Sequence, residues 1–120
     1  MTRRKQLEHD LQRSIKSILD YRLDPDKAWW FHVPNGAKLA RGAAGWSVLK
    51  SLGAVAGVPD MTFLINPGRV AFIELKAGKN QLTAGQKLIR ETCETLGVPF
   101  YVCRSVDEVM AACEELGILK

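Results

Sequence analysis

Two acidic residues and a lysine lie within one apolar segment, residues 57–76. Asp60 follows Pro59, and Glu74 precedes Lys76 by two positions. Carboxylate oxygens are the ligands that Mg²⁺ and Mn²⁺ prefer, and such an ion can polarise a phosphoryl oxygen and lower the pKa of a bound water. A nearby ammonium can orient the attacking water or neutralise charge on the phosphate. These residue types therefore predict metal-dependent hydrolysis of a phosphodiester.

Each part of this pattern also has an ordinary structural explanation. The glycine and proline of residues 57–59 could simply end a helix, and Glu74 and Lys76 could form an exposed ion pair on one face of a strand. A Glu-x-Lys sequence alone is common by chance. Its combination with Pro-Asp about fourteen residues earlier, across a hairpin and before a capped helix, favours the functional interpretation.

The acids can meet only if the segment forms a β-hairpin of suitable register. The apolar runs 61–65 and 70–75 flank Asn66-Pro67-Gly68, whose proline and glycine favour a turn. A two-residue turn, which the local residues favour, would pair Asp60 with Leu75 on the wrong face, whereas a three-residue loop pairs Asp60 with Glu74. We therefore expect an odd-length loop or a β-bulge between the two acids.

The remaining pattern predicts one mixed α/β domain over residues 1–120. We expect a helix over 6–21, a strand over 29–33, a weak helix or loop over 37–52, a helix after Thr83, a strand over 98–103 and a helix after Ser105. With the hairpin, the order is α-β-α-β-β-α-β-α. The strand-helix-strand unit over 70–103 should make its two strands parallel.

The helices are amphipathic, so each predicts a buried face. For the first helix this face is Leu7, Leu11, Ile15 and Ile18; for the helix after Thr83 it is Leu88, Ile89, Thr92, Cys93 and Leu96; for the last it is Val109, Met110, Ala112, Cys113 and Leu116. Glu8 lies at the margin of the first face. As an acid in the first turn it could simply favour the helix dipole.

The composition is that of an ordinary globular domain, with 47% hydrophobic and 25% charged residues. No apolar run approaches the roughly 18 residues of a membrane span, and no signal peptide is evident, so we expect a cytoplasmic protein without a membrane partner. The 3 cysteines form no Cys-x-x-Cys pair, which argues against a disulfide framework or a zinc site. His32 has no second histidine at ligand spacing and is expected to be structural.

A net charge of +4 is compatible with a nucleic-acid partner. Lys38, Arg41 and Lys50 lie in a segment rich in alanine and glycine, where small residues allow a close approach and cations suit phosphates. A solvated basic face explains them equally well. Trp46 could stack on an unpaired base or belong to the core.

At residues 57–60 (Gly-Val-Pro-Asp) and 72–76 (Phe-Ile-Glu-Leu-Lys), the chain resembles the PD-(D/E)XK nuclease superfamily, and within it the virus-type replication-repair branch, the VRR-NUC domain. Residues 32–36, the basic segment after them, Leu82 with Gln86, and residues 104–108 resemble that branch as well, so the likeness covers nearly the whole chain. It implies a restriction-endonuclease-like fold, with a mixed central sheet flanked by helices.

The resemblance also implies roles for single residues. Asp60 and Glu74 would be the main metal ligands, and Lys76 would be the catalytic lysine. Glu8 would be the helix acid that completes the metal site, and the carbonyl of Leu75 would add a backbone oxygen.

Gln86 matches a family glutamine near the active site. It also completes a capping box with Thr83, and because one side chain cannot fully serve both roles, both interpretations stay open. Asn35 joins the basic segment among the expected DNA contacts.

The resulting expectation is a Mg²⁺- or Mn²⁺-dependent, structure-selective DNA endonuclease that acts on branched DNA such as Holliday junctions. A chain this small offers little surface for DNA, so a homodimer is expected. Stand-alone relatives resemble junction resolvases and many are carried by phages, which predicts a phage or prophage protein in a bacterial host cell. The alternatives are a less selective flap or duplex nuclease, a non-catalytic nucleic-acid-binding module, and a tRNA- or DNA-end-processing subunit that needs a partner.

Overall fold

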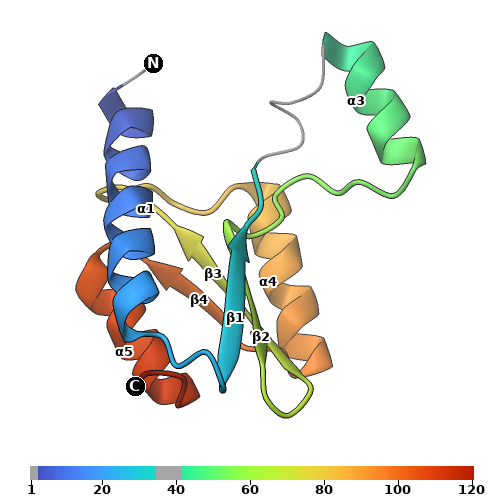
Figure 1. Cartoon of the computed structure of the whole chain (residues 1–120). Helices are drawn as coiled ribbons and strands as arrows, with labels where there is room; N and C mark the ends of the chain where they lie inside the picture. Colours follow the sequence, from blue (N-terminus) through green and yellow to red (C-terminus); the bar gives the residue numbers. More distant parts are fainter. Residues whose placement is uncertain (1–2, 35–41) are drawn as a thin grey trace.

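The computed structural model describes residues 3–34 and 42–120 (Figure 1). Its elements are α1 (Arg3–Arg22), β1 (Ala28–His32), α3 (Gly42–Ser51), β2 (Met61–Ile65), β3 (Arg69–Leu75), α4 (Ala84–Leu96), β4 (Phe100–Cys103) and α5 (Val106–Leu116). This order confirms the predicted α-β-α-β-β-α-β-α arrangement.

One four-stranded sheet, with strand order β1-β2-β3-β4, forms the middle of the molecule. The pairs β1/β2 and β2/β3 are antiparallel, and β3/β4 is parallel, as the strand-helix-strand unit predicted. Helices α1 and α5 lie on one side of the sheet and α4 on the other (Figure 1). Strand β1 is an edge of the sheet.

The hairpin between β2 and β3 has the odd-length loop that the site requires. Ile65 pairs with Arg69, so the loop consists of three residues, 66–68, and the locally favoured two-residue turn does not form. Met61 pairs with Ile73 at the open end. The next position outward therefore sets Asp60 opposite Glu74.

The core lies between the sheet and the α1/α5 layer, because every second residue of β2 and β3 points there. Its buried members are Ile15, Leu19, Ala28, Met61, Phe63, Ile65, Ala71, Ile73, Leu75, Cys103, Val109, Ala112, Cys113, Leu116 and Ile118. The predicted inner face of the last helix is confirmed. Fully burying a side chain of this size contributes about 1.5–3 kcal/mol, so this layer dominates the stability of the fold.

The predicted stripe of α1 is wrong at its first residue. Leu7 is 49% exposed, whereas Leu19, which was not predicted, is buried at 1%. The N-terminal end of α1 extends past the sheet (Figure 1), and Leu7 lines a pocket with Arg3 and residues 77–80 instead of joining the core.

The predicted inner face of α4 is wrong at three positions, Leu88, Thr92 and Leu96, which are all exposed. Leu88 and Leu96 are 64% and 71% exposed, and Cys93 is the buried residue of the helix. Helix α4 covers only part of this side of the sheet, which leaves the flanks of the helix open to solvent (Figure 1).

Helix α3 lies apart from the two layers (Figure 1) and has no buried residue. It forms within the segment for which a weak helix or loop was predicted. None of the described helices is long and apolar enough to cross a membrane.

Candidate active site

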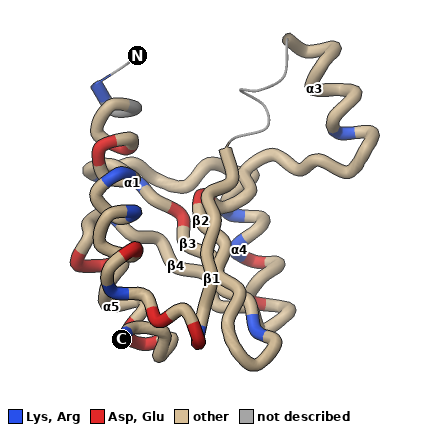
Figure 2. The backbone as a smooth tube through the Cα atoms, viewed as in Figure 1, with Lys and Arg blue, Asp and Glu red and all other residues tan. Residues whose placement is uncertain are grey.

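The hairpin brings Asp60 and Glu74 together on the face of the sheet that α4 covers. Asp60 directly precedes β2, and its Oδ2 accepts a hydrogen bond of 2.7 Å from the backbone N–H of Leu75. This bond holds the carboxylate of Asp60 against β3, next to Glu74. Figure 2 shows acidic positions at β2 and β3, between α1 and α4.

Glu74 is a buried acid, with 3% of its surface exposed. Burial, the neighbouring charge of Asp60 and a hydrogen bond with Asp60 raise its pKa from 4.5 to about 9, while the charge of Lys76 acts in the opposite direction. Its Oε1 is buried and has no hydrogen-bond partner among the described residues. A buried carboxylate with a free oxygen is costly unless a cation or a proton compensates it.

These residues fit a divalent cation. Glu74 keeps one oxygen without a hydrogen bond and lies beside the carboxylate of Asp60, and both residues supply the hard oxygen atoms that Mg²⁺ and Mn²⁺ prefer. Because its pKa is raised, Glu74 would otherwise keep a proton, and a bound dication would take the place of that proton.

Gln86 serves both of the roles that the sequence analysis treated as competing. Its side-chain Oε1 accepts from the backbone N–H of Thr83 at 2.9 Å, and the backbone N–H of Gln86 donates to Thr83 Oγ1 at 3.2 Å, which completes a capping box. Its Nε2 donates to Glu74 Oε2 at 3.0 Å. The expectation that one side chain cannot do both is wrong, because the oxygen and the nitrogen of the amide point to different partners.

Gly57 and Gly85 form a backbone contact that the sequence analysis missed. Gly57 has a φ of +79°, and a Cβ built on it would lie 2.8 Å from the backbone N of Gln86 and the backbone C of Gly85. The segment that leads into Asp60 therefore packs directly on the first turn of α4. The available signal was a glycine in each segment, three residues before Asp60 and one before Gln86.

Lys76 follows β3 directly and is 8% exposed. Its backbone N–H donates to the carbonyl of Cys103 at 3.1 Å, which fixes its position beside β4. In the described part of the chain it forms no ion pair within 4.0 Å, although its charge lowers the pKa of Glu74. Its ammonium is therefore near the acids without being tied to one of them.

His32 supports Asp60 from the neighbouring strand. The carbonyl of Asp60 accepts from the backbone N–H of Val33 at 2.9 Å and from Nδ1 of His32 at 2.8 Å. Because a carbonyl only accepts, Nδ1 carries the proton. The prediction that His32 is structural did not foresee this contact with the backbone of a site residue.

The structure does not gather Glu8 with Asp60 and Glu74 into one metal site. Glu8 is half-buried on α1, and within residues 3–34 and 42–120 no group of three or more acidic, histidine or cysteine residues is placed to hold a metal. The roles of Glu8 and of the Leu75 carbonyl stay predictions. Lys50 is exposed in the last turn of α3.

The other three expected DNA contacts, Asn35, Lys38 and Arg41, lie outside the described residues.

A mixed four-stranded sheet between helical layers, with paired acids and a lysine at the open end of its hairpin, is consistent with the PD-(D/E)XK-like fold. The family model of the VRR-NUC domain matches residues 10–107. The chain belongs to this nuclease-type family. The match includes Asp60, Glu74, Lys76 and Gln86, whereas Glu8 lies outside it.

Two solved structures have the same fold. One, a VRR_NUC domain protein, is 23% identical with a TM-score of 0.67, over 89% of this chain and 84% of that one. The other, a VRR_NUC domain, is 16% identical with a TM-score of 0.59, over 90% of this chain and 95% of that one. No curated protein matches the sequence.

Proposed function

We propose that this protein is a metal-dependent nuclease that hydrolyses phosphodiester bonds in DNA and leaves a 5′-phosphate and a 3′-hydroxyl. The observation that carries the proposal is the buried Glu74, whose Oε1 has no hydrogen bond to a described residue, beside the carboxylate of Asp60. Membership of a nuclease-type family, which implies DNA as the substrate, supports it. Paired carboxylates with a lysine nearby are suited to hydrolysis of a phosphodiester.

Asp60 and Glu74 would hold Mg²⁺ or Mn²⁺, which when bound supplies charge to polarise the phosphoryl oxygen and to lower the pKa of water. Gln86 fixes which oxygen of Glu74 faces the site, because its amide is itself held by Thr83. Gln86 therefore acts through Glu74, as a positioning residue. Lys76 would orient the attacking water and offset the charge that develops on the phosphate.

Within this class we favour branched DNA, such as Holliday junctions, as the substrate, with a homodimer that enlarges the DNA-binding surface and addresses two strands. Lys50, together with Lys38, Arg41 and Asn35, would contact the phosphates. A cytoplasmic location in a bacterial host, and a phage or prophage origin, belong to the same proposal.

Three alternatives remain. A less selective flap or duplex nuclease would use the same residues and differ in substrate preference. A non-catalytic module would bind nucleic acid with steep salt dependence and no turnover. An end-processing subunit would act only with a partner protein.

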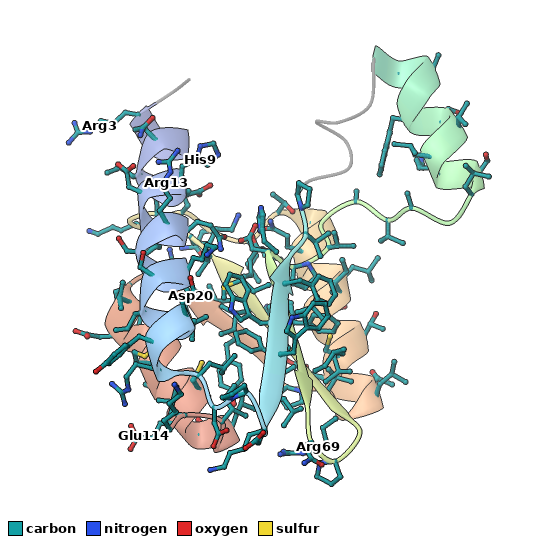
Figure 3. All side chains as sticks on the ribbon, viewed as in Figure 1. Arg3, His9, Arg13, Asp20, Arg69 and Glu114 are labelled. Carbon is teal, nitrogen blue, oxygen red and sulfur yellow. The ribbon has the colours of Figure 1, made fainter. Side chains whose placement is uncertain are left out.

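The test is incubation of the purified protein with junction, flap, duplex and single-stranded DNA in Mg²⁺ or Mn²⁺. Cleavage should require the metal, and Glu74→Gln should reduce it at least about 100-fold, since outer-shell partners of a metal alone cost 10–100-fold. The matched control is Glu114→Gln on α5, which lies far from the site (Figure 3) and should cleave like the wild type. No cleavage of any substrate, or equal loss in both variants, contradicts the proposal.

A further inference from the structure

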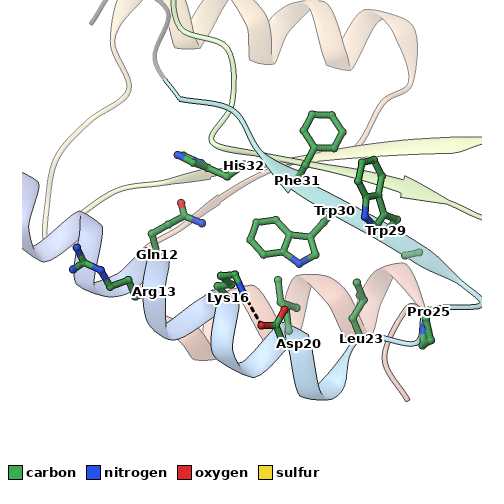
Figure 4. A pocket seen from close by; sticks show the side chains of 12 residues that line it. Gln12, Arg13, Lys16, Asp20, Leu23, Pro25, Trp29, Trp30, Phe31 and His32 are labelled. Carbon is green, nitrogen blue, oxygen red and sulfur yellow. Dashed lines mark hydrogen bonds and ion pairs between the residues drawn. The ribbon is translucent and has the colours of Figure 1, made fainter. Parts of the chain in front are cut away.

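Two aromatic side chains are exposed on the edge strand β1. Trp29 is 62% and Phe31 37% exposed, and their ring centroids are 5.3 Å apart at an angle of 41°. Trp30, between them in sequence, points to the other face and stacks on Phe63. Figure 4 shows Trp30 between β1 and α1, and Trp29 and Phe31 on the opposite side of the strand. The exposed pair is therefore not needed to fill the core.

The exposed pair lies on the face of the sheet that carries the acids. Trp29 pairs with Leu64 and Phe31 with Thr62, and directly paired residues share a face. Asp60 is the next residue of that face on β2, two positions from Thr62. Because alternate residues on a strand are about 6.8 Å apart, the rings form a row that leads to the site.

Cations lie at the far end of this row. Lys27 and Arg69 line, together with Trp29 and Leu64, a cavity of about 510 Å³. Lys27 is 3.9 Å from Asp24, and Arg69 is exposed with no ion pair to any described residue. The face thus runs from Lys27, over two aromatic rings, to the paired acids. Arg69 pairs with Ile65 of the core face and lines the same cavity from the end of β3.

We propose that Trp29 and Phe31 are a stacking platform for unpaired bases of a DNA strand whose backbone passes from Lys27 and Arg69 to the acidic site. Exposed aromatic rings beside cations are the combination that binds single-stranded nucleic acid, because bases stack on the rings while cations follow the phosphates. This inference rests on the proposed function and narrows it. It makes an unpaired strand beside the cleaved phosphate, as in a flap or an opened junction, the preferred substrate.

The test is binding of a labelled oligo-dT, about twelve nucleotides long, in EDTA, where no hydrolysis takes place. The matched ligand is an abasic strand of the same length and charge. Wild-type protein should bind oligo-dT about tenfold or more tightly than the abasic strand, since stacking on an aromatic side chain is worth roughly 5- to 100-fold per base. The double variant Trp29→Ala/Phe31→Ala should lose this difference.

Two variants serve as controls. Trp29→Phe keeps a ring and should retain most of the preference for oligo-dT. Tyr21→Ala removes an aromatic ring that is 77% exposed on α1 and should bind like the wild type. Thermal unfolding checks that each variant is folded. We expect all of them to fold, because substitutions at exposed positions usually change stability little.

Equal binding of oligo-dT and the abasic strand by the wild type, or the same loss in Tyr21→Ala, overturns the platform. So does a change from dimer to monomer in light scattering of the double variant, because the rings would then contact a second copy. A protein that prefers oligo-dT but cleaves nothing contradicts the proposed function alone. A protein that cleaves in Mg²⁺ without preferring oligo-dT contradicts the platform alone.

Discussion

Glu74 holds an unusual position for a carboxyl group, since it is almost fully buried and keeps one oxygen free of hydrogen bonds. The same burial that raises its pKa makes it a strong cation ligand, because a dication relieves both the desolvation and the repulsion from Asp60.

The raised pKa of Glu74 predicts how stability depends on pH without metal. Between about pH 5 and 9 the folded protein retains a proton that the unfolded chain has lost, so the folded state loses stability as pH rises, by at most about 1.4 kcal/mol per pH unit. The measurement is thermal unfolding in EDTA at pH 5, 7 and 9. Glu74→Gln, which does not titrate, should have a flatter profile. Parallel profiles for wild type and variant would show that Glu74 does not bind this proton.

Two variants can separate the two roles of Gln86, which are the capping of α4 and the hydrogen bond to Glu74. Thr83→Ala removes one capping bond and should lower stability by about 1 kcal/mol, with activity nearly intact. Gln86→Ala also removes the bond to Glu74, so we expect activity to fall a further 10–100-fold with a higher requirement for Mn²⁺. Denaturant unfolding and a Mn²⁺ titration of cleavage measure the two effects. Equal activity in both variants would mean that the amide does not position Glu74.

At the scale of elements, the site depends on how the segment before β2 packs on α4. Gly57→Ala should place a methyl group 2.8 Å from the backbone of α4 and displace Gln86 as well as Asp60. Gly53→Ala is the matched control, since Gly53 has a similar positive φ of +105° but nothing within 4 Å. Both variants carry the strain of a left-handed backbone, of about 1–2 kcal/mol.

We expect only Gly57→Ala to lose cleavage activity, and to lose more stability than its control. Thermal unfolding and the cleavage assay are measured for both variants and for the wild type. Similar losses in the two variants would indicate that backbone strain, and not contact with α4, explains the effect.

The order of the elements could be predicted from the sequence, because the apolar periods and the capping residues are local signals. Thr83 and Gly97 delimit α4 as expected. The inner face of α4 could not be predicted, because the sequence does not reveal how much of the sheet the helix covers, and Leu88 and Leu96 remain exposed. The loop of the hairpin was inferred from the site itself, against the local preference of Pro67 and Gly68.

The candidate site, like the fold, could be predicted only in part, because some of its contacts are not local in sequence. The pairing of Asp60 with Glu74 was predicted together with a three-residue loop, because a two-residue turn would have paired Asp60 with Leu75. The contacts of Gln86 with Glu74, of Gly57 with Gly85 and of His32 with the Asp60 carbonyl join segments far apart in sequence. No local pattern encodes such distances. The resemblance placed Gln86 near the site, but its hydrogen bond to Glu74 and the other two contacts are revealed only by the folded chain.

At the scale of the whole molecule, the sheet separates two tasks. The α1/α5 side contains the core, and the α4 side carries the acids and the exposed aromatic pair. The exposed residues of the second side, such as Trp29 and Phe31, can therefore change with little effect on stability.

A crystal soaked in Mn²⁺ tests the central claim most directly. We predict an anomalous peak between the carboxylates of Asp60 and Glu74, bonded to Oε1 of Glu74, and no such peak in Glu74→Gln. A saturating soak of the wild type that leaves this position empty, or a peak bound elsewhere in both proteins, would contradict the account.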